Sequence, residues 1–136
     1  MHDCLFCKIV AGEIPAEKVY EDERVFAFLD IHPINRGHTL VVPKKHFENM
    51  YAMPRKEFEG LMGNVHTLAH DIKNAVSANG INIGMNNEHA AGQVVLHAHV
   101  HIIPRFSEDG FTPWHGKNSN NEEIAMVAHI IRTAMH

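Results

Sequence analysis

Residues 96–104 read Leu96-His97-Ala98-His99-Val100-His101-Ile102-Ile103-Pro104, with a histidine at every second position from 97 to 101. Successive side chains of a β-strand point to opposite faces, so the three imidazoles share one face. Leu96, Ala98, Val100 and Ile102 fall on the other face, which suits a hydrophobic core. The spacing therefore predicts a strand over residues 94–103, and Pro104, which has no N–H, is expected to end its ladder. The simpler alternative is a half-buried strand whose polar face happens to be histidine.

The rest of the sequence predicts an α+β fold: an antiparallel sheet of about five strands, one long helix, and a short helix near each end. Apolar residues recur at spacings of three and four between Phe58 and Val76, which is one face of a helix. Pro54 suits the first position of this long helix, and Asn79-Gly80 suits its end. The apolar and β-branched runs that predict the other strands are residues 19–20, 25–29, 39–42 and 81–85.

Two shorter helices are predicted outside this region. Residues 4–11 indicate a short helical turn, and Asn121-Glu122-Glu123 is expected to cap a final helix, since acidic residues are favourable at a helix N-terminus. We expect a single domain over residues 1–136, with its core at about 4–106 and a C-terminal loop and helix at 107–136. The apolar stripe of the final helix comprises Ile124, Val127, Ala128, Ile131 and Met135.

Composition and charge limit the classes of function. Hydrophobic residues make up 45% of the 136 residues and charged residues 21%, which is typical of a globular domain. The formal net charge of −4 argues against a nucleic-acid partner, because no basic field is available for a phosphate backbone. No apolar run reaches the length of a membrane span. Two cysteines at C-x-x-C spacing and an N-terminus without a signal-peptide pattern predict a cytoplasmic protein that uses the thiols for metal or redox chemistry.

The motifs together resemble the histidine triad (HIT) family, whose members are nucleotide hydrolases and transferases that act at an α-phosphate. The stretch from His97 to Ile103 matches the family signature, and residues 4–15, 28–46 and 86–93 match further family stretches in the same order. The resemblance covers about residues 4–106 and is closest to the zinc-containing prokaryotic branch. A Gln replaces the third triad histidine in the uridylyltransferase branch, so His101 favours the hydrolase branches.

The resemblance assigns catalytic roles. His99 corresponds to the nucleophile that becomes nucleotidylated, and His101 and His38 correspond to the pair that faces the phosphate. Neutral imidazole can attack phosphorus at neutral pH, which is consistent with this assignment. The implied reaction is cleavage at the α-phosphate of a purine nucleotide conjugate with an AMP or GMP moiety, such as a dinucleoside polyphosphate or a nucleoside phosphoramidate. The alternative, from another functional class, is a nucleotide-binding or scaffold protein with little turnover.

The resemblance also implies a nucleotide site. Asp30 corresponds to the carboxylate that binds the ribose hydroxyls, although an Asp at this place could equally be a strand-end turn residue. Asn86 and Gln93 correspond to the residues that hydrogen-bond the phosphate. Ordinary core packing is the alternative for the residues that match the walls of the base pocket, which are Phe6, Ile9, Phe28 and Ile31.

A structural zinc site is implied by four further residues: Cys4, Cys7, His46 and His97. Zn²⁺ typically takes four nitrogen or sulfur ligands, and a closed site of this kind would hold the N-terminal turn on the sheet. The alternatives are a reduced C-x-x-C pair without metal, a thioredoxin-like redox pair, which lacks the βαβ pattern, and a catalytic zinc on all three triad histidines. Alternating residues of one strand are poorly placed to converge on one ion.

Two further expectations come from comparison with the family. Relatives pair the long helix and an edge strand across a two-fold axis, which predicts a homodimer here; Trp114 would then either reach the partner's site or pack locally. Phosphoramidate-cleaving relatives carry Ser or Thr at the position of Val94. Valine is nearly isosteric with Thr but has no hydroxyl, which speaks against efficient cleavage of phosphoramidates.

Overall fold

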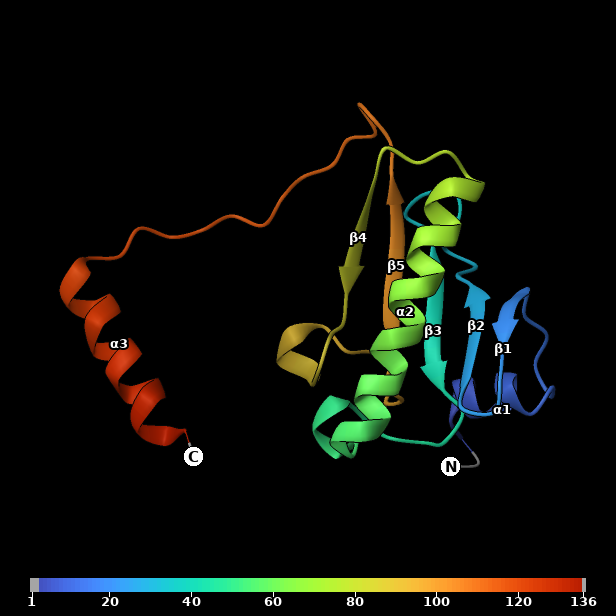
Figure 1. The fold of residues 1–136 in the computed structure, drawn as a ribbon, viewed down its shortest axis with the longest axis horizontal. Coiled ribbons are helices and arrows are strands. Elements are labelled where there is room, and N and C mark those ends of the chain that lie inside the picture. The colour runs from blue at the N-terminus through green and yellow to red at the C-terminus, as the bar shows by residue number, and fades with distance from the viewer. Residues whose placement is uncertain (1–2, 136) are drawn as a thin grey trace.

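Five antiparallel strands form one sheet in the order β1-β2-β3-β5-β4, and one long helix crosses it (Figure 1). The structure is a computed structural model that describes residues 3–135. It confirms the predicted α+β fold with a five-stranded antiparallel sheet, one long helix and two shorter ones. The elements are α1 (Leu5–Val10), β1 (Lys18–Glu21), β2 (Val25–Leu29), β3 (Thr39–Pro43), α2 (Arg55–Ala75), β4 (Gly80–Gly84), β5 (Val100–Arg105) and α3 (Asn121–Ala134), with short 3₁₀ turns at Met50–Ala52 and His89–Ala91.

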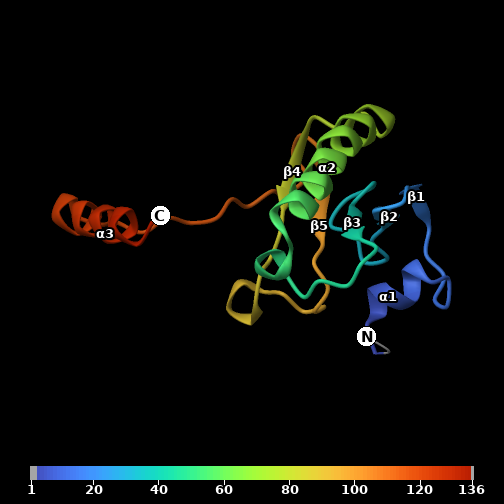
Figure 2. The same ribbon diagram turned by 60° about the horizontal axis from the view of Figure 1, so that its bottom comes forward.

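The sheet has an apolar layer on each face, and α2 and α1 lie on opposite sides of it (Figure 2). On one face, α2 buries Leu61, Val65, Leu68 and Ile72, and this cluster includes Ala98, Val100 and Ile102. On the other face, α1 packs against β2 and β3, and the apolar cluster there contains no residue of β5. The cluster under α1 consists of Phe6, Ile9, Phe26, Phe28, Leu40 and Val42.

The last strand starts later than predicted. β5 begins at Val100 rather than at residue 94, and residues 95–97 form a bend. The reason is pairing: β3 meets β5 only from Val100 to Ile102, whereas the N–H of Ala98 donates to the carbonyl oxygen of Phe47 in a loop (2.7 Å). The expected alternation of core-facing apolar residues with histidines holds from Ala98 to Ile102. Leu96, however, is 52% exposed and does not join the core.

Proline does not end the last strand either. β5 continues through Pro104 to Arg105 and pairs there with β4, with Pro104 opposite Ile81. The ladder with β3 ends at Ile102, so the missing N–H of Pro104 removes no bond from that ladder.

The long helix ends earlier than predicted, at Ala75 rather than at Asn79-Gly80. Ser77 adopts a left-handed backbone conformation (φ +56°), which Gly or Asn more often occupies at this place. The N–H groups of Ser77 and Ala78 then donate to the carbonyl oxygens of Asn74 and Lys73, which closes the last turn. At the other end, Pro54 is the capping residue and precedes the first helical residue by one position.

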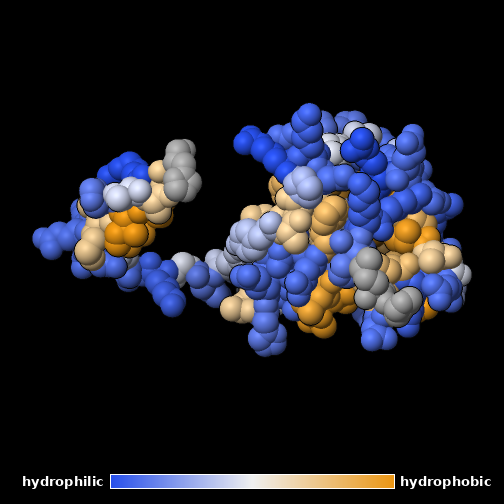
Figure 3. All heavy atoms as spheres, turned by 90° about the horizontal axis from the view of Figure 1, so that it is seen from below, coloured by the Kyte–Doolittle hydropathy of each residue, from blue (hydrophilic) through white to orange (hydrophobic). Residues whose placement is uncertain are grey.

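The C-terminal helix α3 lies away from the rest of the molecule at the end of an extended segment (Figures 1 and 2). It is capped by Asn120, one residue earlier than expected, whose side chain accepts from the N–H of Glu123 (2.8 Å). None of its described residues is buried, and Figure 3 shows apolar side chains gathered on its surface. None of the helices in the described part of the chain combines the length and apolar character needed to cross a membrane. The large apolar side chains that α3 exposes are Ile124, Met126, Val127, Ile130 and Ile131.

Candidate functional site

The middle histidine of the triad is held in one tautomer. His99 is 7% exposed, and its Nδ1 lies 2.7 Å from the carbonyl oxygen of His97. A carbonyl oxygen only accepts, so Nδ1 carries the ring proton and Nε2 keeps its lone pair. Burial lowers the pKa of His99 below its ordinary value, which keeps the ring neutral at neutral pH. The ring therefore has a free, unprotonated nitrogen, as a nucleophile requires.

The third histidine carries its proton on the opposite ring nitrogen. The N–H of Ile34 donates to Nδ1 of His38 (3.0 Å), so the proton of His38 lies on Nε2 and is donated to Nδ1 of His101 (2.9 Å). Neutral His101 then has its own proton on Nε2. Burial, reinforced by the neighbouring histidine rings, lowers the pKa of His101 to about 4. Burial also lowers the pKa of His38, against the opposing effect of Asp30 3.7 Å away.

A cavity of about 510 Å³ opens beside these rings. Its walls include His99 and His101, together with most of the residues predicted to bind a nucleotide. Asp30 lies at its edge, where Oδ1 accepts from the N–H of His32 (2.8 Å) and Oδ2 accepts no hydrogen bond within the described residues. Three of the four predicted walls of the base pocket are buried and also belong to the core: Phe6, Ile9 and Phe28. The fourth, Ile31, is 82% exposed at the rim of the cavity. Asn86 also lines the cavity.

A second constellation brings together Cys4, Cys7, His46 and His97, whose ligand atoms all lie within 4.8 Å of one another. Nδ1 of His97 lies 3.3 Å from Sγ of Cys4 and 3.2 Å from Nδ1 of His46, and Sγ of Cys7 lies 3.4 Å from Nδ1 of His46. A tetrahedral zinc ion with bonds of about 2.0–2.3 Å would hold its ligand atoms about 3.3–3.8 Å apart. The four residues thus fit a metal ion.

The protonation of His97 is also the one that a metal ligand requires. Nε2 of His97 lies 2.8 Å from the carbonyl oxygen of Pro43, so it carries the proton and Nδ1 offers its lone pair to the cluster. Burial lowers the pKa of His97 to about 4, which keeps the ring neutral. Burial, with the neighbouring Cys4 thiol, raises the pKa of Cys7 to about 11 in the metal-free pair. Metal binding must therefore displace a thiol proton, and affinity for the metal should rise with pH.

Comparison with known proteins decides the family, because the HIT domain model matches residues 11–108. The chain belongs to the HIT domain family. Protein hit of Bacillus subtilis is 48% identical over 110 residues, which are 80% of this chain and 76% of that protein. The crystal structure of SMU.412c from Streptococcus mutans superposes with a TM-score of 0.94 at 44% identity and covers 100% of this chain and 87% of that one.

The names of two other relatives state an enzymatic activity or a bound metal. The Arabidopsis thaliana protein named adenylylsulfatase HINT3 is 39% identical over 108 residues, which are 79% of this chain and 55% of that protein. A Zn-bound histidine triad family protein from Mycobacterium smegmatis superposes with a TM-score of 0.78 at 34% identity, covering 97% of this chain and 98% of that one. Together with the four-residue cluster, the second relative indicates a metal site in this HIT domain.

No group of metal-ligand atoms within residues 3–135 joins all three triad histidines of this HIT domain. A second group of possible metal-ligand atoms, besides the four-residue cluster, consists of Asp30, His38 and His101. Its two rings are already joined by the hydrogen bond from Nε2 of His38, and a nitrogen that carries a proton has no lone pair for a metal. The three triad histidines thus lie at two different sites, with His97 in the metal cluster and His99 and His101 at the cavity.

Gln93 is placed differently from the other predicted site residues of the HIT domain. It is 3% exposed and does not line the cavity. Its Nε2 donates to the carbonyl oxygens of Glu48 (2.6 Å) and Val95 (3.0 Å), and its Oε1 accepts from the N–H of Glu88 (2.8 Å). In this state its amide fixes the loop that carries Val94, which is 89% exposed at the edge of the cavity. The contact of Gln93 with a phosphate stays a prediction.

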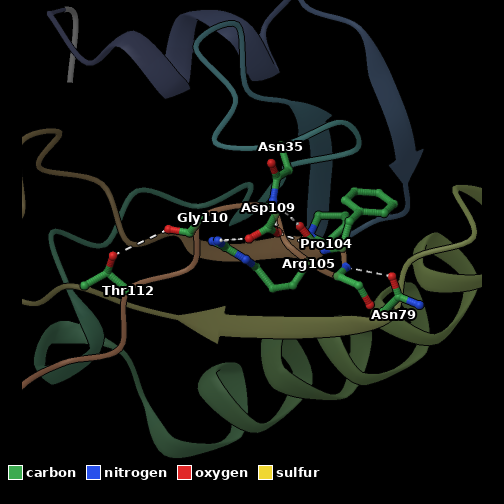
Figure 4. A network of polar contacts seen from close by, with 9 residues as sticks. Asn35, Asn79, Pro104, Arg105, Asp109, Gly110 and Thr112 are labelled. Carbon is green, nitrogen blue, oxygen red and sulfur yellow. Dashed lines mark hydrogen bonds and ion pairs between the residues drawn. The ribbon is translucent and has the colours of Figure 1, made fainter.

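A polar network that the sequence motifs did not predict holds the loop before His38 against the end of β5 (Figure 4). Nδ2 of Asn35 donates to Oδ2 of Asp109 (2.8 Å) and to the carbonyl oxygen of Pro104 (2.9 Å). The main-chain carbonyl oxygen of Asn35 accepts from the N–H of His38 (3.1 Å). The Arg105 guanidinium donates to Asp109 (2.8 Å) and holds the pKa of that carboxyl at about 2. The network therefore connects the backbone of His38 to the strand that carries His101.

Proposed function

We propose that this HIT domain hydrolyses or transfers purine nucleotide conjugates at the α-phosphate through a nucleotidyl-His99 intermediate. The observation that carries the proposal is the opposite tautomers of His99 and His101 at one cavity: one ring offers a lone pair and the other an N–H. Membership of the HIT family supports a nucleotide hydrolase or transferase at a general level. A relative named adenylylsulfatase is consistent with cleavage next to an adenylyl group.

In the first step, the lone pair on Nε2 of His99 attacks the α-phosphorus, and the bond from phosphorus to the leaving group breaks with its electron pair on the leaving group. The leaving group departs as an anion or takes a proton from solvent. The N–H of His101 donates to a phosphate oxygen, where charge accumulates in the transition state. His38 keeps that N–H on the correct nitrogen by donating to the other one.

In the second step, water attacks the phosphorus of the nucleotidyl-histidine. The bond from phosphorus to nitrogen breaks, the electron pair returns to Nε2 of His99, and the water loses its proton to solvent or to the product phosphate. Attack by an alcohol or an amine in place of water would give transfer rather than hydrolysis. The carbonyl oxygen of His97 stabilises the His99 ring in both steps, because Nδ1 carries its proton throughout.

The nucleotide is proposed to lie along the cavity with its purine between the apolar walls and its ribose hydroxyls at Asp30. Oδ2 of Asp30 accepts no hydrogen bond within residues 3–135 and can accept from a hydroxyl. Asn86 lines the cavity and would donate to a phosphate oxygen. Gln93 reaches the phosphate only when its amide leaves the carbonyl oxygen of Glu48. The residues of the apolar walls are Phe6, Ile9, Phe28 and Ile31.

Rapid-quench mass spectrometry tests the intermediate. With adenosine or guanosine phosphoramidates and dinucleoside polyphosphates as substrates, nucleotide should be found on the tryptic peptide that contains Leu96–Arg105. His99→Ala should lose activity by several orders of magnitude with its fold retained, against about 10²–10³ for removal of one donor to the phosphate. Label on the His99→Ala chain would contradict the assignment. Tight nucleotide binding without label or product would favour the scaffold alternative.

We further propose that the metal is one structural zinc ion per chain, held by Cys4, Cys7, His46 and His97. The donor set of two thiols and two imidazoles suits zinc, and all four positions are filled by protein, which leaves no open position for substrate. When bound, zinc would link three segments of chain and take no part in the bond changes. Metal analysis of protein purified without an affinity tag should find about one zinc per chain, and a value near zero would contradict the proposal.

We also propose that the chain forms a homodimer. The support lies in two uncovered features: β4 is an outer strand of the sheet, and α3 exposes its apolar face. Trp114 is 99% exposed, which agrees with a role at a partner subunit rather than with local packing.

A further inference from the structure

The metal cluster and the nucleotide cavity share a wall. Cys4 and Cys7 lie at the start of α1 with Phe6 between them, and Phe6 is 4% exposed. Its ring edge faces the ring of His99, with the centroids 5.0 Å apart and the planes at 85°. The same ring lies 5.9 Å from the ring of His97, which contributes Nδ1 to the cluster. One aromatic side chain thus contacts a metal ligand and the nucleophile.

A second connection runs through the backbone. The ring of His97 points into the metal cluster, and the carbonyl oxygen of the same residue accepts the proton on Nδ1 of His99. A shift of residue 97 would therefore change both the cluster and the orientation of the nucleophile. Of the predicted catalytic residues, His99 is the one that both the ring of Phe6 and the carbonyl oxygen of His97 contact within the described chain.

Helix α1 depends on the cluster for its position. It has only six residues, which is too short to be stable as an isolated helix, and only Phe6 and Ile9 of it are buried. Its capping residue is a thiol, Cys4, and its first turn has no acidic residue to favour the N-terminus. The cluster joins α1 to residues far along the chain, since Cys4 contacts His97 and Cys7 contacts His46.

The main core does not depend on α1. The cluster between α2 and the sheet contains no residue of α1, whereas Phe6 and Ile9 belong to the separate apolar cluster on the other face. Loss of the metal should therefore loosen α1 and the cavity wall and leave the sheet and α2 folded.

We propose that Phe6 is a positioning residue through which the metal site and the nucleotide site are thermodynamically coupled, so that metal binding tightens nucleotide binding and the reverse. This inference rests on the proposed nucleotide site and metal site. Coupling between two sites is reciprocal: the factor by which metal changes nucleotide affinity must equal the factor by which nucleotide changes metal affinity. Typical couplings are about 5–150-fold, and we expect a factor of about ten here.

Adenosine 5′-monophosphate is the probe, because its binding can be measured without turnover. Calorimetry with zinc-loaded and zinc-depleted full-length chain should give a dissociation constant about ten times higher for the depleted form. Competition with a chromogenic chelator should show zinc held tighter by the same factor at saturating nucleotide. Hydrogen exchange should increase on zinc removal in the peptide that covers residues 3–12 and remain slow in α2 and the sheet.

Two matched variants test the residue. Phe6→Leu should still bind one zinc and should bind the nucleotide more weakly, with a coupling factor close to one. Phe26→Leu removes the same ring from the same apolar cluster, where Phe26 is 8% exposed, but Phe26 lies outside the cavity wall. Phe26→Leu should keep the full coupling factor between zinc and nucleotide binding. The comparison holds even where zinc removal unfolds part of the chain, because both variants lose the same volume.

Two outcomes overturn the inference. They are equal nucleotide affinity with and without zinc, and the same coupling factor in Phe6→Leu and Phe26→Leu. Each leaves the proposed function standing, because the zinc-loaded chain still binds nucleotide and forms the intermediate. Absence of nucleotide binding by the zinc-loaded chain overturns the proposed function as well, so the two failures are distinguishable.

Discussion

His99 and His101 are chemically the same residue, two positions apart, yet their surroundings place the ring proton on opposite nitrogens. A backbone carbonyl accepts from Nδ1 of His99, whereas Nδ1 of His101 accepts from His38. The first ring is left with a lone pair and the second with an N–H, both on Nε2. The proposed division into nucleophile and phosphate donor thus rests on two hydrogen bonds.

The buried rings make stability depend on pH. The pKa of His101 falls from its ordinary 6.5 to about 4, so between these values the unfolded chain binds a proton that the folded chain does not. The free energy of unfolding should therefore be highest above about pH 6.5 and fall as the pH drops toward 4, by on the order of 1–3 kcal/mol for this ring. Urea unfolding at several pH values measures it.

The variant His101→Gln has no proton to gain, so its free energy of unfolding should change less between pH 7 and pH 5. The groups that face His101 are His38, His99 and Asp30, and all remain in the variant. The same substitution at His66, on the exposed side of α2, should leave the slope unchanged. Equal slopes for wild type and His101→Gln would contradict this account.

Val94 offers a second test at a single residue. It is 89% exposed and lines the cavity beside the triad, where Val94→Thr would add a hydroxyl with almost no change in volume. An amine leaving group needs a proton as it departs, and a hydroxyl can relay one, so kcat/KM for adenosine phosphoramidates should rise at least several-fold. Dinucleoside polyphosphates should show little change, because their leaving group departs as an anion. Val94→Ala is the control, and equal rates for the Thr and Ala variants would refute the relay.

The sequence pointed to residues that belong to a motif, and their roles stay predictions. The triad spacing, the C-x-x-C pair and the family resemblance led to the residues of the two clusters, and the structure brings Cys4 and His97 together across 93 positions. Asn35 and Asp109 were missed, because their contact joins two loops and an Asp before a Gly reads only as a turn signal. The burial of Gln93 could not be predicted either, since it depends on where the carbonyl oxygen of Glu48 lies.

At the scale of elements, the loop between β2 and β3 sets the position of His38, and Gly37 is its critical residue. Gly37 has φ +89°, and a Cβ there would lie 3.1 Å from Cγ of Pro104 and 3.2 Å from Cγ1 of Val76. Gly37→Ala should lower the free energy of unfolding by at least about 1–2 kcal/mol, the cost of a left-handed non-glycine residue. It should also lower kcat, because His38 would shift relative to His101.

Urea unfolding and steady-state kinetics measure the two effects of Gly37→Ala. Gly12 has a similar φ of +81° but nothing within 4 Å of the position of a Cβ, and it lies far along the chain from the triad. Gly12→Ala should therefore cost similar backbone strain and leave kcat unchanged. If both variants lower kcat equally, the loop does not position His38 in the way described.

Sequence patterns predicted the elements better than their ends. The five strands were confirmed because apolar and β-branched runs favour strands, and the long helix because its period-3.6 pattern records which face is buried. The ends of α2 and β5 were wrong, because they depend on Ser77 taking a left-handed conformation and on how far β3 extends alongside β5. These are properties of the assembled sheet. The cytoplasmic location stays a prediction.

At the scale of the whole molecule, the uncovered face of α3 predicts association. Light scattering at micromolar concentration should give about twice the chain mass of 15.3 kDa. Ile131→Asp places a charge on the apolar side of α3, where Ile131 is 55% exposed, and should weaken the dimer with little effect on the fold of the sheet. Thr133→Asp, on the same helix, should have no such effect. A mass near that of one chain for the wild type would refute the dimer.

The place of β5 in the sheet has a consequence for synthesis of the chain. β5 is the last strand to be made, yet it lies between β3 and β4, and the stretch from His97 to Arg105 completes the sheet, the metal cluster and the triad together. A nascent chain that stops before this stretch has β1, β2 and β3 as one piece of sheet with an open edge, β4 as an unpaired strand, and none of the three triad rings. A translation product that stops before His97 therefore lacks part of the proposed nucleotide site and part of the proposed metal site, and both sites form only once this late stretch has been made.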